Sequence, residues 1–141
     1  MELKKILVAV NGNGADEEAI KLACSVARKS KAAVYVVYII QVKRSLPLDA
    51  EISPEIQRAE EVLTHAEDIA SEQDYDVETD LLQAREVGPA IVDEAMERDI
   101  DLIVLGMPYK RAFGMFSLGT TVPYVLREAP CRVLLCREPI S

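Results

Sequence analysis

The chain has 141 residues, of which 50% are hydrophobic and 28% charged, and this is the balance of one globular domain rather than of a disordered chain. The formal net charge of −8 argues against nucleic acid and anionic lipid surfaces as partners of the whole molecule. No apolar run approaches the ~20 residues of a membrane span, and the first residues lead into a strand-like segment rather than a signal peptide. We therefore expect a cytoplasmic protein without membrane insertion.

The first half of the chain predicts strands and helices in alternation. A short β-branched run ends at the turn-forming sequence Asn-Gly-Asn-Gly, and an amphipathic helical stripe follows it. The next apolar run is continuous, as expected of a strand covered on both faces. A loop without a clear period, residues 41–53, then leads to a helix opened by a proline. The predicted elements are a strand over 5–10, a helix over 15–27, a strand over 33–40 and a helix over 54–70.

The second half continues the alternation and completes the predicted fold. Its predicted elements are a weaker edge strand over 76–83, a helix from Gly88 to Met96, a strand over 102–105, a helix over 122–129 and a strand over 133–135. Strands that alternate with helices predict a parallel sheet with right-handed crossovers and helices on both faces. The prediction is thus a single α/β domain over residues 1–141, a Rossmann-like three-layer sandwich around a five-stranded parallel sheet.

Ligands of such sheets bind at the carboxyl ends of the strands, which directs attention to the segment from Gly106 to Thr121. It lies between a buried strand and a helix, and its glycines and helix-starting N–H groups suit an anion. The basic pair Lys110 and Arg111 is placed to reach the same anion. The same residues would also serve ordinary structural roles, as a strand end, a threonine helix cap and solvated loop charge. The anion-site interpretation and the structural interpretation therefore both stay open.

Other chemistry-bearing residues give weaker signals. The only histidine, His65, lies among polar residues of a predicted helix and is interpreted as part of a solvated face. The three cysteines form no CxxC pair, and no nucleophile has a visible base partner. Gly114 and Gly119 imitate part of a phosphate-binding P-loop but lack its lysine. We therefore expect no catalytic residue, no metal ligand and no enzyme activity.

Four segments carry a resemblance to the universal stress protein family, and together they span nearly the whole chain. They are residues 6–12, 36–39, 101–106, and Gly119-Thr120 followed by 129–134. The resemblance implies a five-stranded parallel sheet of strand order 3-2-1-4-5, related to folds that bind adenine nucleotides. It also implies a two-fold dimer through the last strand. The candidate dimer-interface residues are Arg132, Val133, Leu134, Leu135 and Cys136.

Members of this family that bind ATP share a pattern of Gly, two residues, Gly, nine residues, Gly, then Ser or Thr. The corresponding residues here are Gly106, Tyr109, Gly119 and Thr120, so the spacing is kept and the second glycine is a tyrosine. If that position needs φ > 0, tyrosine costs on the order of 1–2 kcal/mol and its ring competes with phosphate for space. The family also places an aspartate where this chain has Asn11, and Mg²⁺ usually needs a carboxylate beside the phosphates.

The resemblance implies a dimeric, non-enzymatic regulator of the stress response whose adenine-nucleotide site is weakened or remodelled. The alternatives are a working ATP or AMP site with at most slow hydrolysis, and a cytosolic regulatory domain associated with a transporter. ATP or AMP is the expected cofactor, without a metal. The candidate nucleotide-binding residues are Ala9, Val10, Asn11, Ile39, Gly106, Tyr109, Lys110, Gly119, Thr120 and Thr121.

Overall fold

The computed structural model describes residues 2–109, 111–112, 115–116 and 118–140, and its centre is a five-stranded sheet in which all neighbouring strands are parallel. The strand order is β3-β2-β1-β4-β7, which confirms the predicted order 3-2-1-4-5. The strands of this sheet are β1 (Lys5–Val10), β2 (Ala33–Gln41), β3 (Glu78–Ala84), β4 (Leu102–Met107) and β7 (Arg132–Arg137). The helices are α1 (Ala15–Arg28), α2 (Ser53–Glu72), α3 (Val87–Glu97) and α4 (Thr121–Glu128).

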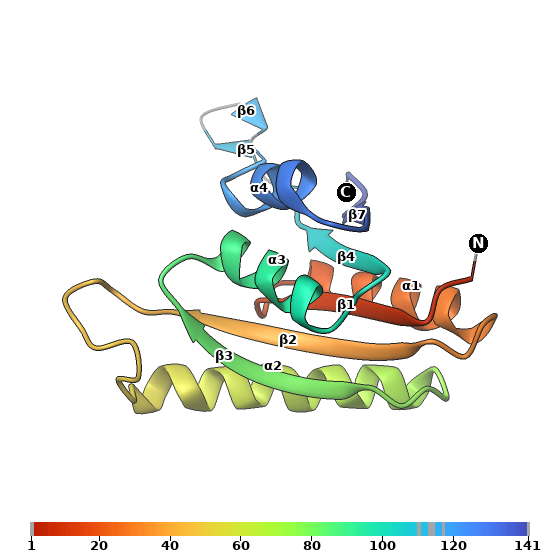
Figure 1. Cartoon of the computed structure of the whole chain (residues 1–141), viewed down its shortest axis with the longest axis horizontal. Helices are drawn as coiled ribbons and strands as arrows, with labels where there is room; N and C mark the ends of the chain where they lie inside the picture. Colours follow the sequence, from red (N-terminus) through yellow and green to blue (C-terminus); the bar gives the residue numbers. More distant parts are fainter. Residues whose placement is uncertain (1, 110, 113–114, 117, 141) are drawn as a thin grey trace.

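Helices cover both faces of the sheet and make three layers (Figure 1). Helices α1 and α2 bury one face, against alternate residues of β1 such as Ile6 and Val8. Helices α3 and α4 bury the other face, against Leu7 and its neighbours on β2 and β4. Alternation of this kind follows from the period of two in a strand, and burial of both faces explains why β1, β2 and β4 are almost continuously apolar.

The segment between β4 and α4 contains a feature that the sequence analysis missed. Residues interpreted there as a glycine-rich turn include two short antiparallel strands, β5 (Arg111–Ala112) and β6 (Met115–Phe116). In Figure 1 this hairpin extends beyond α4, away from the main sheet. Strands of two residues are too short to show an alternation of apolar and polar residues, so no sequence pattern predicts them.

The loop between β2 and α2 is held by side chains of β3 and the residue after it. Gln83 donates from Nε2 to the carbonyl oxygens of Leu48, at 2.8 Å, and Ala50, at 2.9 Å. Arg85 donates from Nη1 to the carbonyl oxygens of Lys43, at 2.5 Å, and Leu46, at 2.8 Å. Two polar side chains therefore fix a segment that has no regular structure of its own.

Arg98, the residue after α3, joins the edge strand β3 to the end of α3. Its guanidinium group donates to Glu94 Oε2 at 2.9 Å, to Glu78 Oε2 at 3.3 Å and to Asp80. The same group lies 4.6 Å from the centre of the Tyr35 ring on β2. The planar, five-donor geometry of arginine suits such a combination of carboxylates and an aromatic face.

The described residues also bear on the expectations about membrane spans and about the cysteines. No helix among them is long and apolar enough to cross a membrane. Cys24, Cys131 and Cys136 are free thiols, of which Cys24 lies on the buried face of α1.

Candidate functional site

A cavity of about 390 Å³ opens at the carboxyl ends of β1, β2 and β4, where the loops after these strands meet the start of α4. Its volume falls in the range of ~300–1,000 Å³ that is usual for small-molecule sites. The described residues that line it are Ala9, Val10, Asn11, Asn13, Val37, Tyr38, Ile39, Val87, Ile91, Leu105, Gly106, Met107, Pro108, Leu118, Gly119, Thr120, Thr121 and Val122.

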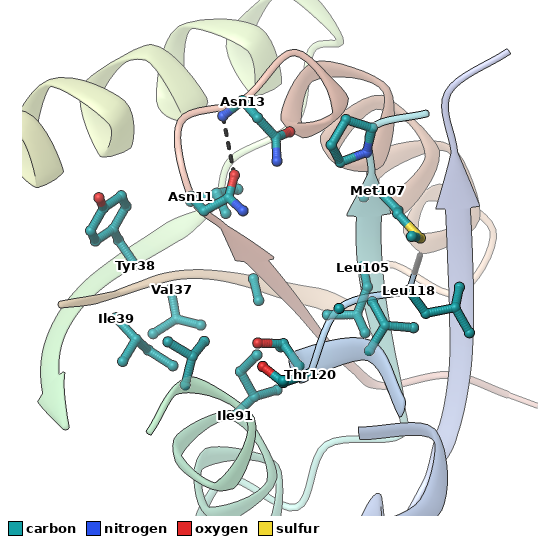
Figure 2. A pocket seen from close by; sticks show the side chains of 18 residues that line it. Asn11, Asn13, Val37, Tyr38, Ile39, Ile91, Leu105, Met107, Leu118 and Thr120 are labelled. Carbon is teal, nitrogen blue, oxygen red and sulfur yellow. Dashed lines mark hydrogen bonds between the residues drawn. The ribbon is translucent and has the colours of Figure 1, made fainter. Parts of the chain in front are cut away.

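The floor of the cavity is a row of side chains across three neighbouring strands. Ala9 on β1 is paired in register with Val37 on β2 and with Leu105 on β4. The small methyl group of Ala9 therefore lies between two larger side chains, and the sheet is hollowed at its central strand. Ile39 and Ile91 extend the apolar wall toward α3, as Figure 2 shows. An apolar hollow of this kind suits an aromatic ring system.

The polar rim begins in the loop after β1, which Asn11 and Asn13 shape. Asn11 Oδ1 accepts a hydrogen bond from the Asn13 N–H at 3.1 Å, and Asn13 Oδ1 accepts one from the Ala15 N–H at 2.8 Å. The second bond satisfies a donor at the first residue of α1, where helical N–H groups have no partner inside the helix. Both asparagines thus hold the loop in place while their side chains border the cavity (Figure 2).

The opposite rim is the start of α4, with Thr120 as its N-cap and Thr121 as its first residue. Thr120 is exposed and its hydroxyl makes no capping bond to the helix. Figure 2 shows the hydroxyl on the cavity side. The first N–H groups of a helix point outward with the positive end of its dipole, so this rim favours an anion. Pro123 has no N–H and adds nothing to the set of donors.

The two glycines of this rim are required for different reasons. A Cβ atom on Gly106 would lie 2.6 Å from the carbonyl oxygen of Ala15, because the start of α1 approaches β4 at this point. Gly119 has φ +70°, and a Cβ atom there would meet nothing within 4 Å. Gly106 therefore permits helix–sheet contact, whereas Gly119 permits a left-handed backbone turn before α4.

Tyr109 is not among the described residues that line the cavity. Its ring stacks on the guanidinium group of Arg137, 4.8 Å from the ring centre, at the end of β7. Nor does its backbone have a positive φ, since the non-glycine residues with that conformation in the described part of the chain are Lys31, Asp74 and Asp99. The condition under which tyrosine would strain this loop is thus not met.

The other predicted site residues divide into those at the cavity and those outside the described ranges. The predicted residues that line the cavity are Ala9, Val10, Asn11, Ile39, Gly106, Gly119, Thr120 and Thr121. Lys110 lies outside the residues that the structure describes, and no side-chain position is described for Arg111. Sequence reasoning missed Asn13, which it treated only as a turn former, and Val87 and Ile91, which α3 contributes. The period of two on β2 would have found Val37 from Ile39.

A second cavity, of about 230 Å³, lies between α1 and α2 and contains Asp16 and His65 in its wall. The Asp16 carboxylate accepts hydrogen bonds from the Gly12 N–H at 2.7 Å and the Asn11 N–H at 3.2 Å. Burial raises the pKa of Asp16 above its usual value, and these two hydrogen bonds act in the opposite direction. In the part of the chain that the structure describes, no group of three or more His, Cys, Asp or Glu side chains is arranged to hold a metal ion.

The predicted dimer-interface residues form β7, an edge strand of the sheet. Val133, Leu134, Leu135 and Cys136 are half-buried, and Arg132 is exposed. Val133 and Leu135 contact the core under α3 and α4, and Leu134 contacts the core on the other face. This edge strand therefore carries apolar side chains, and an edge of this kind invites pairing with another strand.

Comparison with known proteins relates this geometry to one family. The model of the universal stress protein family matches residues 2–137. A universal stress protein of Methanocaldococcus jannaschii is 30% identical over 142 residues, which cover 96% of this chain and 83% of that protein. The solved structure of a universal stress protein from Archaeoglobus fulgidus has a TM-score of 0.75 at 28% identity and covers 96% of this chain and 94% of that chain. A structure of the universal stress protein from Archaeoglobus fulgidus in complex with dAMP also has a TM-score of 0.75, at 26% identity, and covers 96% of this chain and 98% of that chain.

Proposed function

The chain belongs to the universal stress protein family, and on that premise we propose that it is a regulatory module of the stress response whose cavity binds an adenine nucleotide. The observation that carries the proposal is the cavity over Ala9, with its apolar floor on three strands and a rim of N–H and hydroxyl donors. The dAMP complex of the protein from Archaeoglobus fulgidus supports the adenine part of the proposal.

The base would lie on the apolar floor, and the phosphate at the donor rim. Val37, Ile39 and Leu105 offer aliphatic surface to the face of a purine ring. Thr120 and Thr121 offer hydroxyl groups at the start of α4, where the helix dipole favours negative charge. We therefore propose that Ala9, Ile39, Thr120 and Thr121 belong to the nucleotide site.

The position of Tyr109 supports a remodelled site rather than a lost one. Its ring is stacked on Arg137 and leaves the cavity open, so the tyrosine does not fill the space that a phosphate needs.

The second part of the proposal is that the protein binds the nucleotide without catalysing a reaction, apart from at most slow hydrolysis of ATP. It is supported by the lining, since the described residues around the cavity include no Asp, Glu, His or Cys that would act as a general acid or base.

Released and added nucleotides test the proposal. We expect heat denaturation of the purified protein to release an adenine nucleotide, and AMP to raise the melting temperature more than CMP does. A ligand at 100 times its Kd stabilises a protein by about 2.7 kcal/mol. If heating releases no adenine nucleotide and millimolar AMP does not raise the melting temperature, the proposed function is contradicted.

A matched pair of variants locates the site. Ala9→Leu fills the hollow of the floor and should weaken AMP binding at least about tenfold, because the base loses its space. Ala84→Leu is the control, since Ala84 is also half-buried on the face covered by α3 but does not line the cavity. Equal affinities in the two variants would place the site elsewhere.

A further inference from the structure

The polar groups around the cavity carry no charge among the residues that the structure describes there. The lining includes no Asp, Glu, Lys, Arg or His, in a chain whose formal net charge is −8. The polar side chains that face it are amides and hydroxyls, from Asn11, Asn13, Thr120 and Thr121 (Figure 2). Of the residues that the structure describes around the cavity, only neutral donors are available to a phosphate.

The amide orientations of Asn11 and Asn13 make this rim a donor surface. Each side-chain oxygen already accepts a backbone N–H, that of Asn13 in one case and that of Ala15 in the other. A primary amide has its oxygen and its NH₂ group on opposite branches, so an oxygen turned toward the backbone turns the NH₂ group away from it. Figure 2 shows both Nδ2 atoms on the cavity side, facing the rim that carries Thr120.

The nearest acidic side chain in sequence is directed elsewhere. Asp16 accepts the N–H groups of Asn11 and Gly12 and lines the separate cavity between α1 and α2. It is not among the described residues that line the cavity over Ala9. A carboxylate is therefore close to the loop after β1, but its hydrogen bonds hold the backbone of that loop.

We infer that the cavity binds a nucleoside monophosphate directly, with the phosphate between the start of α4 and the amide donors of Asn11 and Asn13, and no divalent cation between phosphate and protein. The inference rests on the proposed function and specifies its ligand. Mg²⁺ is held by carboxylates and phosphates, and NH₂ donors repel it. A monophosphate carries about −1.5 to −2 charges, and the further charges of a triphosphate would gain no countercharge from the described residues of this rim.

Isothermal titration of the full chain with AMP, in excess Mg²⁺ and again in EDTA, tests the inference. We expect Kd values for AMP that agree within about twofold, because no metal takes part, and weaker binding of Mg·ATP than of AMP. An affinity for AMP that rises about tenfold or more with Mg²⁺ would overturn the inference while the proposed function stands. If no adenine nucleotide binds in either medium, both fail.

The variant Asn11→Asp tests the donor directly. Aspartate keeps the oxygen that accepts the Asn13 N–H but replaces the NH₂ donor by an anionic oxygen. Loss of a hydrogen bond to a charged group is worth about 1.5–3 kcal/mol, so in EDTA the affinity for AMP should fall about tenfold to a hundredfold. Mg²⁺ should restore part of that loss in the variant only.

The control is Gln57→Glu, which makes the same change in net charge on an exposed face of α2 and should leave the Kd for AMP unchanged. Far-ultraviolet circular dichroism checks that both variants are folded. An Asn11→Asp protein that is folded and binds AMP as tightly in EDTA as the original chain would contradict the role assigned to the amide.

Discussion

Gly106 and Gly119 show how one residue type serves two needs within one site. At Gly106 the neighbour is a backbone oxygen of α1, which cannot rotate away as a side chain would. At Gly119 space is open and only the backbone conformation, φ +70°, excludes most residues. Neither requirement involves a ligand, so a glycine in this segment is not by itself a sign of phosphate binding.

Substitutions at the two glycines should therefore behave differently. Gly106→Ala should lower the free energy of unfolding by about 1–3 kcal/mol through crowding, and Gly119→Ala by about 1–2 kcal/mol through strain. Asparagine tolerates the left-handed region, so Gly119→Asn should recover part of the loss, whereas Gly106→Asn should recover none. Urea unfolding measures all four variants. Recovery at both positions would contradict the crowding of Gly106 against Ala15.

Removal of the Tyr109 ring should leave the cavity almost unchanged. Because the ring lies on Arg137 and not in the cavity, Tyr109→Ala should change the Kd for AMP by less than about threefold. A fluorescence or calorimetric titration against the original chain measures the change. A tenfold gain would mean that the ring obstructs the site in solution, and a tenfold loss that it contacts the ligand.

Sequence reasoning and the family resemblance pointed to several residues that line the cavity in the structure. Gly106 follows a predicted strand, so the rule for parallel sheets brings it to the edge where the cavity opens, whereas Asn11 and Ile39 were singled out by the family resemblance. Tyr109 could not be placed in that way, because its position depends on β4 pairing with β7 as far as Arg137. That register is a long-range contact that no local pattern contains.

Asp101 couples two strands where the sheet begins. Its carboxylate accepts hydrogen bonds from the N–H groups of Lys4, at 2.8 Å, and Lys5, at 2.9 Å, before β1 and β4 pair. These backbone hydrogen bonds, with that of Lys4 the largest cause, hold the pKa of Asp101 below its usual value of 3.8. The ionised carboxylate is thus favoured by the folded state over the unfolded state.

The pH dependence that follows has a definite sign. A lowered pKa in the folded state stabilises the protein above the unfolded value of 3.8, and the contribution is lost as pH falls through the lower folded value. The stability advantage of the original chain over Asp101→Asn should be largest near neutral pH and shrink below pH 3.8. Urea unfolding of both proteins across this range measures it. A constant difference would contradict the assignment.

Whole elements were predicted well where burial imposes a period. The long apolar runs of β2 and β4 and the stripe of α1 gave the order of elements and, with the handedness of crossovers, the layers. The hairpin of β5 and β6 was missed because it is too short for a period. Val87 and Ile91 of α3 were missed at the site because a helix face shows burial but not which neighbour buries it.

At the scale of the whole molecule, the apolar edge of β7 is the basis for an expected dimer. We expect the protein to sediment as a dimer at micromolar concentration, and Val133→Lys to sediment as a monomer, because a charge at this edge opposes strand pairing. Leu48→Lys, at a side chain that is 47% exposed in the loop after β2, is the control and should remain dimeric. Circular dichroism checks the folding of both variants. A monomeric original chain would contradict the prediction.

The bonds from Gln83 and Arg85 to the loop after β2 bear on how the molecule opens. Their five carbonyl partners are spread from Val42 to Ala50, so the loop cannot lift without breaking side-chain bonds at the end of β3. Loop and strand end should then open as one local unfolding unit. The Leu46 amide bonds to the Lys43 carbonyl and the Ala50 amide to the Pro47 carbonyl. In native-state hydrogen exchange, these two amides should have the same opening free energy. That free energy should fall by the same amount at both amides in Arg85→Ala.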